Sequence, residues 1–321
     1  MTRSAQNSTA PAVVTSDAMV CEVLNGALGG YRMLRQWEAS DPIAMLRQDA
    51  ADVRVLVAFG SVPLRSDLID ALPNLGLVQV MSAGYDGVDP ALLIERGIQL
   101  ANVGEANSGV VADHALALAL AARRHIINGD NWVRTGQWDN VGRYPLVSTI
   151  SEEKAGILGL GHIGRSIARR LAGFGVETAW WGPRPKPDES LPRADSLLAL
   201  AKASSLLFIS CPGAPETEKL VDRNVIEAVG ADGLIINVSR GSVVDEDALI
   251  DALRNGRLGW AALDVFEKEP APVARWADVP NVVLSPHHAG VSFGALDEIR
   301  KRVRENVDRF HAGEPVLNRI I

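Results

Sequence analysis

The stretch Gly159-Leu160-Gly161-His162-Ile163-Gly164 decides the fold of this 321-residue chain. An apolar run that predicts a buried strand precedes it, and a helical pattern and then a second apolar run follow it. In this setting Gly159 permits a tight turn, Gly161 lets the backbone approach a pyrophosphate, and Gly164 lets the helix pack on the strand. The N-terminus of the helix adds free N–H groups and a partial positive charge. Glycine turns are common, but this setting predicts dinucleotide binding.

The same alternation of strands and helices extends along the chain in both directions from this turn. Strands are expected at residues 53–59, 77–81, 154–160, 176–181, 206–211, 234–238, 260–265 and 282–285. Helices are expected at 66–72, 107–124, 163–172, 222–229, 245–255 and 293–311, and residues 132–146 are expected to form an irregular connection. The pattern predicts an α/β protein with two units, each built on a parallel sheet. The apolar stripe of the last helix needs a partner surface, which favours its return to the first unit.

Composition and charge exclude several classes of protein. Hydrophobic residues make up 47 % of the chain, and 32 basic against 39 acidic residues give a net charge of −7, which argues against a nucleic-acid binder with a generally basic surface. The two cysteines, Cys21 and Cys211, are too few for a disulfide framework or a Cys-rich zinc site and indicate a reducing compartment. No apolar run approaches the ~20 residues that span a bilayer, and the polar first 11 residues, an expected disordered leader, lack the core of a signal peptide. We therefore expect a cytoplasmic protein with no metal, nucleic-acid or membrane partner.

The residues after the second strand of the glycine motif indicate which dinucleotide binds. The sequence Gly182-Pro183-Arg184-Pro185-Lys186 has no carboxylate, and the next acidic residue is Asp188. An acidic residue at this place normally holds the ribose hydroxyls of NAD. The absence of this acidic residue, together with the presence of Arg184 and Lys186, predicts that the cofactor is NADPH, with weaker use of NADH possible. The alternative is a solvated basic turn.

Three further polar residues follow predicted strands: Arg240, Glu269 and His287. The carboxyl ends of the strands line the ligand crevice of an open parallel sheet, so these side chains are candidates for catalysis. His288 is adjacent to His287 and is a competing candidate on proximity alone.

With these motifs the sequence resembles the D-isomer-specific 2-hydroxyacid dehydrogenase family from about residue 53 onward. The matching stretches are 82–89, 159–164, 237–245, 263–270 and Pro286-His287. Within the family the sequence is most similar to the NADPH-linked glyoxylate/hydroxypyruvate reductases. This similarity rests on Gly136-Gln137-Trp138 and on the absence of an acidic residue at the end of the strand expected at 176–181. The resemblance implies two Rossmann-like domains with the active site in the cleft between them. The substrate domain would comprise residues 1–104 and 290–321, the dinucleotide-binding domain residues 105–289, and the protein would be a homodimer.

The resemblance also implies roles for individual residues. His287, which directly follows proline as in the family pattern, would be the general acid, Glu269 would orient it, and Arg240 would bind the carboxylate of the 2-oxo acid and polarise its ketone. Ser82, Ala83 and Gly84 would bind the substrate together with Arg240 and His287. The expected cofactor-binding residues are Gly159, Gly161, His162, Ile163, Gly164, Gly182, Arg184, Lys186, Cys211, Pro212, Thr217, Val238, Ser239 and Asp264.

Three residues have more specific expected roles. Cys211 is expected to be a small apolar residue near the cofactor and not a nucleophile, and Asp264 is expected to anchor the nicotinamide carboxamide. His114, outside the cofactor-binding set, is expected to serve packing.

The implied reaction is reduction of glyoxylate or hydroxypyruvate by NADPH to the D-2-hydroxy acid. A larger 2-oxo acid, aromatic or 2-ketogluconate, remains an alternative substrate. A cofactor-sensing, corepressor-like binding protein is an alternative from another class, and the intact set of Arg240, Glu269 and His287 counts against it.

Overall fold

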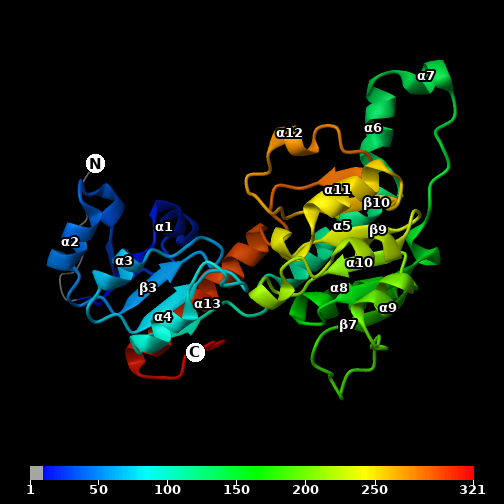
Figure 1. Cartoon of the computed structure of the whole chain (residues 1–321). Helices are drawn as coiled ribbons and strands as arrows, with labels where there is room; N and C mark the ends of the chain where they lie inside the picture. Colours follow the sequence, from blue (N-terminus) through cyan, green and yellow to red (C-terminus); the bar gives the residue numbers. More distant parts are fainter. Residues whose placement is uncertain (1–9) are drawn as a thin grey trace. The chain divides into compact units, whose positions relative to one another are not determined.

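The computed structural model describes residues 10–321, so most of the expected polar leader lies outside the described residues. The chain divides into two compact units (Figure 1). The first consists of the chain up to Asn107 together with Ser292–Ile321, and the second of Ser108–Val291. Each unit contains one parallel β-sheet, which confirms the predicted fold class. Within the described residues no helix is both long and apolar enough to cross a membrane.

The sheet of the first unit has the strand order β2-β1-β3-β4-β5. Its strands are β1 (Ala12–Thr15), β2 (Arg32–Leu34), β3 (Val55–Ala58), β4 (Leu77–Val80) and β5 (Gln99–Ala101). Its helices are α1 (Ala18–Leu24), α2 (Pro42–Asp49), α3 (Ser66–Asp70), α4 (Pro90–Glu95) and α13 (Phe293–Ala312). Every residue of β1, β3 and β4 is buried, as expected for parallel strands that are covered on both faces.

Helix α13 belongs to the first unit although it comes last in the chain. Its buried residues Ile299, Val303, Val307 and Phe310 share one apolar cluster with the strands, including Val55. The apolar stripe of the last helix therefore packs against the first unit, because burial of that stripe stabilises the helix.

The sheet of the second unit has the strand order β11-β10-β9-β8-β6-β7. Its strands are β6 (Lys154–Leu158), β7 (Glu177–Trp181), β8 (Leu206–Ile209), β9 (Leu234–Asn237), β10 (Trp260–Leu263) and β11 (Val282–Leu284). Its helices are α5 (Ser108–Arg123), α6 (Ile126–Arg134), α7 (Gln137–Val141), α8 (His162–Gly173), α9 (Leu197–Lys202), α10 (Arg223–Val229), α11 (Glu246–Arg254) and α12 (Val273–Trp276).

Two apolar layers cover the second sheet. Helices α5 and α8 pack in one buried cluster, and α9, α10 and α11 pack in the other. The strand order reverses at β6, because the chain passes from β6 to β7 on one side and then to β8 on the other. In sheets of this kind the crevice at the carboxyl ends of the strands, at such a reversal, is where ligands bind.

The expectation of an irregular connection at residues 132–146 was wrong for its first part. Helix α6 covers Trp132, and α7 follows it. The preceding helix α5 ends at Arg123, because His125 adopts a left-handed conformation with φ 49°. Neither α6 nor α7 contains a buried residue, so neither packs into the apolar core of the second unit.

Candidate active site

The glycine turn joins β6 to α8, as the sequence predicts. Gly159 has φ 91°, and a Cβ added there would lie 2.7 Å from the Cα of Cys211. A Cβ on Gly164 would lie 2.2 Å from the carbonyl oxygen of Gly159. By contrast, a Cβ on Gly161 would meet no protein atom within 4 Å. The protein's own packing therefore requires the first and third glycines, whereas the second borders open space at the N-terminus of α8.

This geometry fits a dinucleotide. A helix N-terminus presents backbone N–H donors and a partial positive charge, which suit a pyrophosphate. His162 and Ile163 form the first turn of α8, with the His162 side chain exposed. Ser210, which sequence reasoning missed, donates a hydrogen bond from Oγ to the carbonyl oxygen of Gly159 at 2.8 Å and so fixes the turn.

Basic side chains gather after β7. Arg184 is exposed and Lys186 half-buried, and within residues 10–321 neither forms an ion pair. Arg193, which sequence reasoning missed, donates from Nη2 to the carbonyl oxygen of Gly182 at 2.7 Å. An isolated parallel β-bridge between Arg193 and Trp180 places Arg193 next to Gly182. This contact becomes visible only in the folded structure.

The loop after β8 lies against the glycine turn. Burial raises the pKa of Cys211 to about 12, so the side chain is a thiol at neutral pH and a poor nucleophile. Thr217 Oγ1 accepts a hydrogen bond from the N–H of Ala214 at 2.9 Å and donates to the carbonyl oxygen of Pro212 at 2.9 Å. The Thr217 hydroxyl therefore shapes the loop around Pro212.

The turn after β9 presents Arg240. The buried side chain of Asn237 accepts from the N–H of Ser239 at 3.0 Å and donates from Nδ2 to the carbonyl oxygen of Arg240 at 2.9 Å. Val238 is buried, and its N–H donates to Ile209 in β8. Asn237 was absent from the expected site residues, although it precedes them directly and organises their turn.

His287 and Glu269 form a hydrogen-bonded pair. Nδ1 of His287 lies 2.6 Å from Oε2 of Glu269, and the N–H of Phe266 donates to Oε1 at 3.0 Å. Partial burial by itself would raise the pKa of Glu269, but the two hydrogen bonds and the charges of His287 and Arg240 leave it below its usual value. His287 and Arg240 thus both act electrostatically on Glu269 within the second unit.

Asp264 holds the turn that carries His287. Its buried carboxylate accepts from the N–H of His288 at 3.0 Å and from the N–H of Ala289 at 2.9 Å. His287 itself has φ 48°, a left-handed conformation that is unfavourable for histidine. The two hydrogen bonds from neighbouring residues fix the turn and so help to impose this conformation.

A pair of histidines adjoins Asp264. Nε2 of His114 lies 3.4 Å from Oδ1 of Asp264 and 2.9 Å from Oγ of Ser285. The same hydroxyl oxygen lies 3.3 Å from Nδ1 of His288. Burial lowers the pKa of His114, although the charge of Asp264 opposes this effect. His114 therefore does more than fill space, which sequence reasoning missed because α5 and the turn after β11 are far apart in the chain.

The expected substrate-binding residues Ser82, Ala83 and Gly84 belong to the first unit, directly after β4. Ser82 Oγ accepts from the N–H of Gly60 at 3.1 Å and donates to the carbonyl oxygen of Gly84 at 2.7 Å. Asn102 Nδ2 donates to the carbonyl oxygen of Ala83 at 2.7 Å. The carbonyl groups of this turn are thus held in place by side chains.

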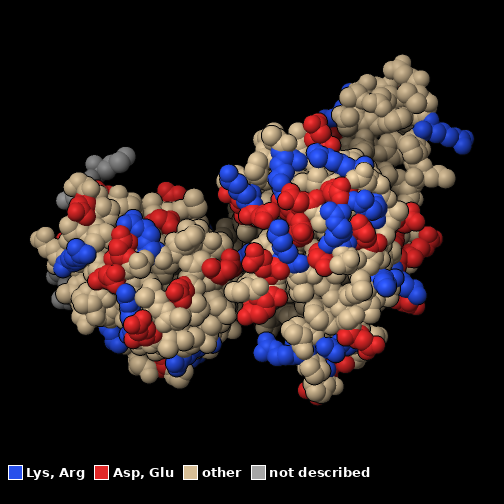
Figure 2. All heavy atoms as spheres, in the orientation of Figure 1, with Lys and Arg blue, Asp and Glu red and all other residues tan. Residues whose placement is uncertain are grey.

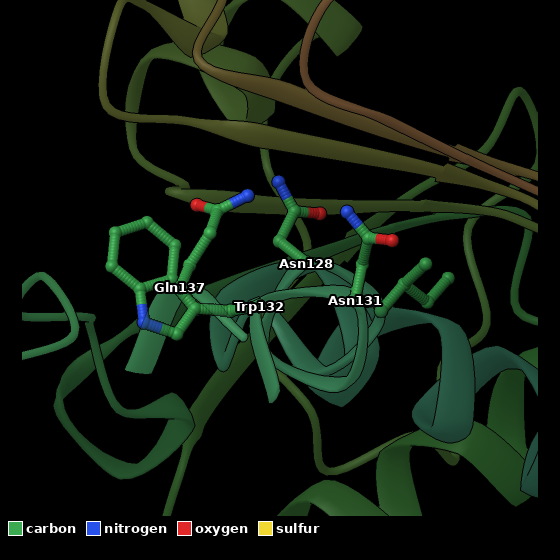
Figure 3. A pocket seen from close by; sticks show the side chains of 5 residues that line it. Asn128, Asn131, Trp132 and Gln137 are labelled. Atoms are coloured by element: carbon green, nitrogen blue, oxygen red, sulfur yellow. The ribbon is translucent and has the colours of Figure 1, made fainter. Parts of the chain in front are cut away.

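A pocket of about 430 Å³ lies on α6 and α7 of the second unit (Figure 3). It is lined by Ile127, Asn128, Asn131, Trp132 and Gln137. None of the expected catalytic or cofactor-binding residues lines this pocket, so it is a feature apart from the candidate active site.

Comparison with known proteins gives several matches. Residues 116–289 match the family described as "D-isomer specific 2-hydroxyacid dehydrogenase, NAD binding domain". A glyoxylate/hydroxypyruvate reductase of Arabidopsis thaliana is 36 % identical over 269 residues, 84 % of this chain and 83 % of the relative. A hydroxyphenylpyruvate reductase of Plectranthus scutellarioides is 34 % identical (91 % and 93 % covered), and a 2-ketogluconate reductase of Gluconobacter oxydans is 33 % identical (86 % and 89 % covered).

Solved structures resemble the chain over almost its whole length. A 2-hydroxyacid dehydrogenase from Ketogulonicigenium vulgare superposes with a TM-score of 0.89 at 38 % identity, covering 98 % of this chain and 99 % of that one. An NADPH-dependent glyoxylate/hydroxypyruvate reductase from Sinorhizobium meliloti, in complex with NADP and malonate, gives a TM-score of 0.88 at 33 % identity, covering 97 % of each chain.

Proposed function

The chain belongs to the D-isomer specific 2-hydroxyacid dehydrogenase family, and on that premise we propose that it reduces glyoxylate or hydroxypyruvate to the D-2-hydroxy acid with NADPH. Its activity as a 2-hydroxyacid dehydrogenase follows from the family, whereas the substrate and the choice of NADPH are the proposal. The observation that carries it is the pair formed by His287 and Glu269, with the charge of Arg240 acting on Glu269.

The proposed mechanism assigns each of these side chains one task. His287 engages Glu269 through Nδ1, so Nε2 is the nitrogen left to face a substrate. The carboxylate of Glu269 holds Nδ1, and Nε2 of His287 donates its proton to the carbonyl oxygen of the 2-oxo acid. Arg240 pairs with the substrate carboxylate, for which a planar guanidinium is well suited. A bound dinucleotide would supply a hydride to the carbonyl carbon, and the electron pair of the C=O π bond would form the new O–H bond with the proton from His287.

The second unit is proposed to hold the dinucleotide. The pyrophosphate is assigned to the turn around Gly161, and the nicotinamide carboxamide to Asp264. In the first unit, the backbone N–H groups of Ala83 and Gly84 are proposed to bind the substrate carboxylate.

Preference for NADPH is supported by the basic residues after β7. Arg184 and Lys186 supply positive charge where a 2′-phosphate would lie, and Arg193 is held nearby through Gly182. The Sinorhizobium meliloti relative is named as an NADPH-dependent enzyme and its structure contains NADP, which agrees with this preference. The test is a comparison of kcat/KM for NADPH and NADH, and equal values would contradict the proposal.

Other 2-oxo acids are the second candidate substrates, because the relatives include reductases of hydroxyphenylpyruvate and 2-ketogluconate. The deciding experiment measures NADPH oxidation with glyoxylate, hydroxypyruvate, hydroxyphenylpyruvate and 2-ketogluconate. A higher kcat/KM for either of the last two would replace the proposed substrate. No turnover with any of the four would favour a cofactor-sensing protein.

A homodimer through α6 and α7 is part of the proposal. These helices project from the second unit (Figure 1), and their surface carries few charges on the face shown in Figure 2. Their exposed apolar side chains are Ile126, Ile127, Val133, Trp138 and Val141. Exposed apolar surface of this extent is typical of a protein interface, and a two-fold dimer is the commonest way to cover it.

A cytoplasmic location also belongs to the proposal. Cys21 and Cys211 are both free thiols, which is the usual state of cysteine in reducing compartments. Fractionation of cells that produce the protein tests this location.

A further inference from the structure

Three side chains outside the catalytic pair offer metal-ligating atoms in one place. They are His114 on α5, Asp264 after β10 and His288 after β11, and their ligand atoms lie within 4.8 Å of one another. Because three separate segments of the second unit supply them, no sequence motif marks the group. Two imidazoles and a carboxylate form a donor set that suits zinc and other divalent transition metals.

One donor distance matches a tetrahedral site, and the ligand atoms of all three residues lie within 4.8 Å of one another. Ligand bonds of about 2.0–2.2 Å in a tetrahedron place neighbouring donor atoms roughly 3.3–3.6 Å apart. Nε2 of His114 and Oδ1 of Asp264 are 3.4 Å apart. Oγ of Ser285 lies between the two imidazoles, 2.9 Å from Nε2 of His114 and 3.3 Å from Nδ1 of His288.

The burial of the group also suits a cation. The carboxylate of Asp264 accepts two backbone hydrogen bonds and retains further lone pairs for a metal. Asp264 is 1 % exposed, and its negative charge would be offset by a dication. The exposed His288 gives an ion access from solvent.

We propose that His114, Asp264 and His288 form a binding site for a divalent transition metal such as Zn²⁺, with the Ser285 hydroxyl or water as the fourth ligand. If Asp264 also anchors the nicotinamide, which rests on the proposed function, the ion and the dinucleotide compete. The metal site itself does not depend on that function.

The test measures metal binding directly on the tag-free, full-length chain without dinucleotide. Calorimetric titration with Zn²⁺ and visible spectroscopy with Co²⁺ are expected to show one ion per chain and bands of tetrahedral coordination. His288→Asn, at an exposed position, and His114→Asn are each expected to weaken Zn²⁺ binding by more than about tenfold, the smallest effect usual for loss of even an outer-shell partner. His287→Asn is the matched control, because this neighbour lies outside the group and should leave Zn²⁺ binding unchanged.

Three results would overturn the proposal. They are the absence of stoichiometric Zn²⁺ binding by the wild-type chain, wild-type affinity in both His114→Asn and His288→Asn, and loss of binding in His287→Asn alone. The last would place the ion on His287 and Glu269 instead. Because binding is measured without substrate or dinucleotide, a failure of the proposed reductase function would not alter any of these outcomes.

Discussion

Nδ1 of His287 lies 2.6 Å from Oε2 of Glu269, and the backbone of His287 is in a left-handed conformation. The hydrogen bonds to Asp264 from the next two residues help to fix that conformation. The ring is thus oriented from two sides, by Glu269 through its side chain and by Asp264 through the backbone of its turn. Orientation of this kind prepares a general acid before substrate binds.

Replacement of His287 by Asn is expected to lower kcat about 10²- to 10⁴-fold, because proton transfer by a positioned side chain contributes about that much. NADPH affinity, measured by fluorescence quenching, should stay within about twofold, since no cofactor contact is assigned to this residue. A folded variant that keeps most of the wild-type kcat would refute the assignment.

Replacement of Glu269 by Gln tests the pair through pH. The pKa of Glu269 lies below its usual value, so the carboxylate is ionised throughout the neutral range and becomes protonated only in stronger acid. Because the carboxylate form orients His287, protonation of Glu269 in acid should lower kcat/KM of the wild-type chain, and Glu269→Gln should lose this acid limb while having a lower kcat/KM at neutral pH. An acid limb that is the same in both chains would show that Glu269 does not assist His287.

The sign of the effect on stability follows from the same pKa. A carboxyl group whose pKa is lower in the folded state stabilises the fold above its unfolded pKa, and this contribution is lost as the pH falls through the folded pKa. Denaturation of Glu269→Gln should accordingly depend less on pH in the acid range than that of the wild-type chain.

Alanine substitutions at two glycines separate folding from cofactor binding. Gly161→Ala should leave Tm nearly unchanged, because the added Cβ meets no protein atom within 4 Å, but should weaken NADPH binding. Gly164→Ala should destabilise the fold by about 1–3 kcal/mol or more, because its Cβ would lie 2.2 Å from the carbonyl oxygen of Gly159. Thermal denaturation and NADPH titration of both variants check this contrast. If the two variants had equal effects on Tm and on NADPH binding, the expected difference would be contradicted.

Removal of the two basic side chains in Arg184→Ala/Lys186→Ala should raise KM for NADPH at least about tenfold, since hydrogen bonds to charged groups contribute roughly 1.5–3 kcal/mol each. KM for NADH should hardly change, because NADH lacks the 2′-phosphate. A parallel rise in both would mean that these residues form only a solvated turn.

Introduction of charge on the projecting helices tests the dimer. Val133→Asp/Trp138→Asp should shift the protein to a monomer in analytical ultracentrifugation, because both side chains are exposed and apolar. Met19→Asp is a matched control, since Met19 is also exposed but lies in α1 of the first unit. A wild-type chain that is already monomeric at micromolar concentration would contradict the proposed homodimer.

The features that depend on local sequence could be predicted. The glycine turn needs three glycines at fixed spacing, and Arg240 and His287 each follow closely on a short apolar run. Apolar runs mark buried strands because parallel strands are covered on both faces. The fold class and the regions of the main strands were therefore accessible from the residues themselves.

The features that depend on contacts across the chain could not be predicted. Ser285 lies 171 residues from His114, and Arg193 lies 11 residues beyond the carbonyl group of Gly182 that it contacts. Such contacts follow from strand order, which no local pattern specifies. Helices α6 and α7 were also missed; both are short, and neither buries a residue against a core.

The return of α13 to the first unit governs the order in which the chain can fold during synthesis. Val55 and Leu77 share their apolar cluster with Val303 and Val307, which are synthesised only after the whole second unit. The second unit is continuous in sequence and can close its sheet before α13 is made. Until α13 has been synthesised, the nascent polypeptide therefore exposes one face of β3 and β4, where a chaperone that recognises apolar segments would bind.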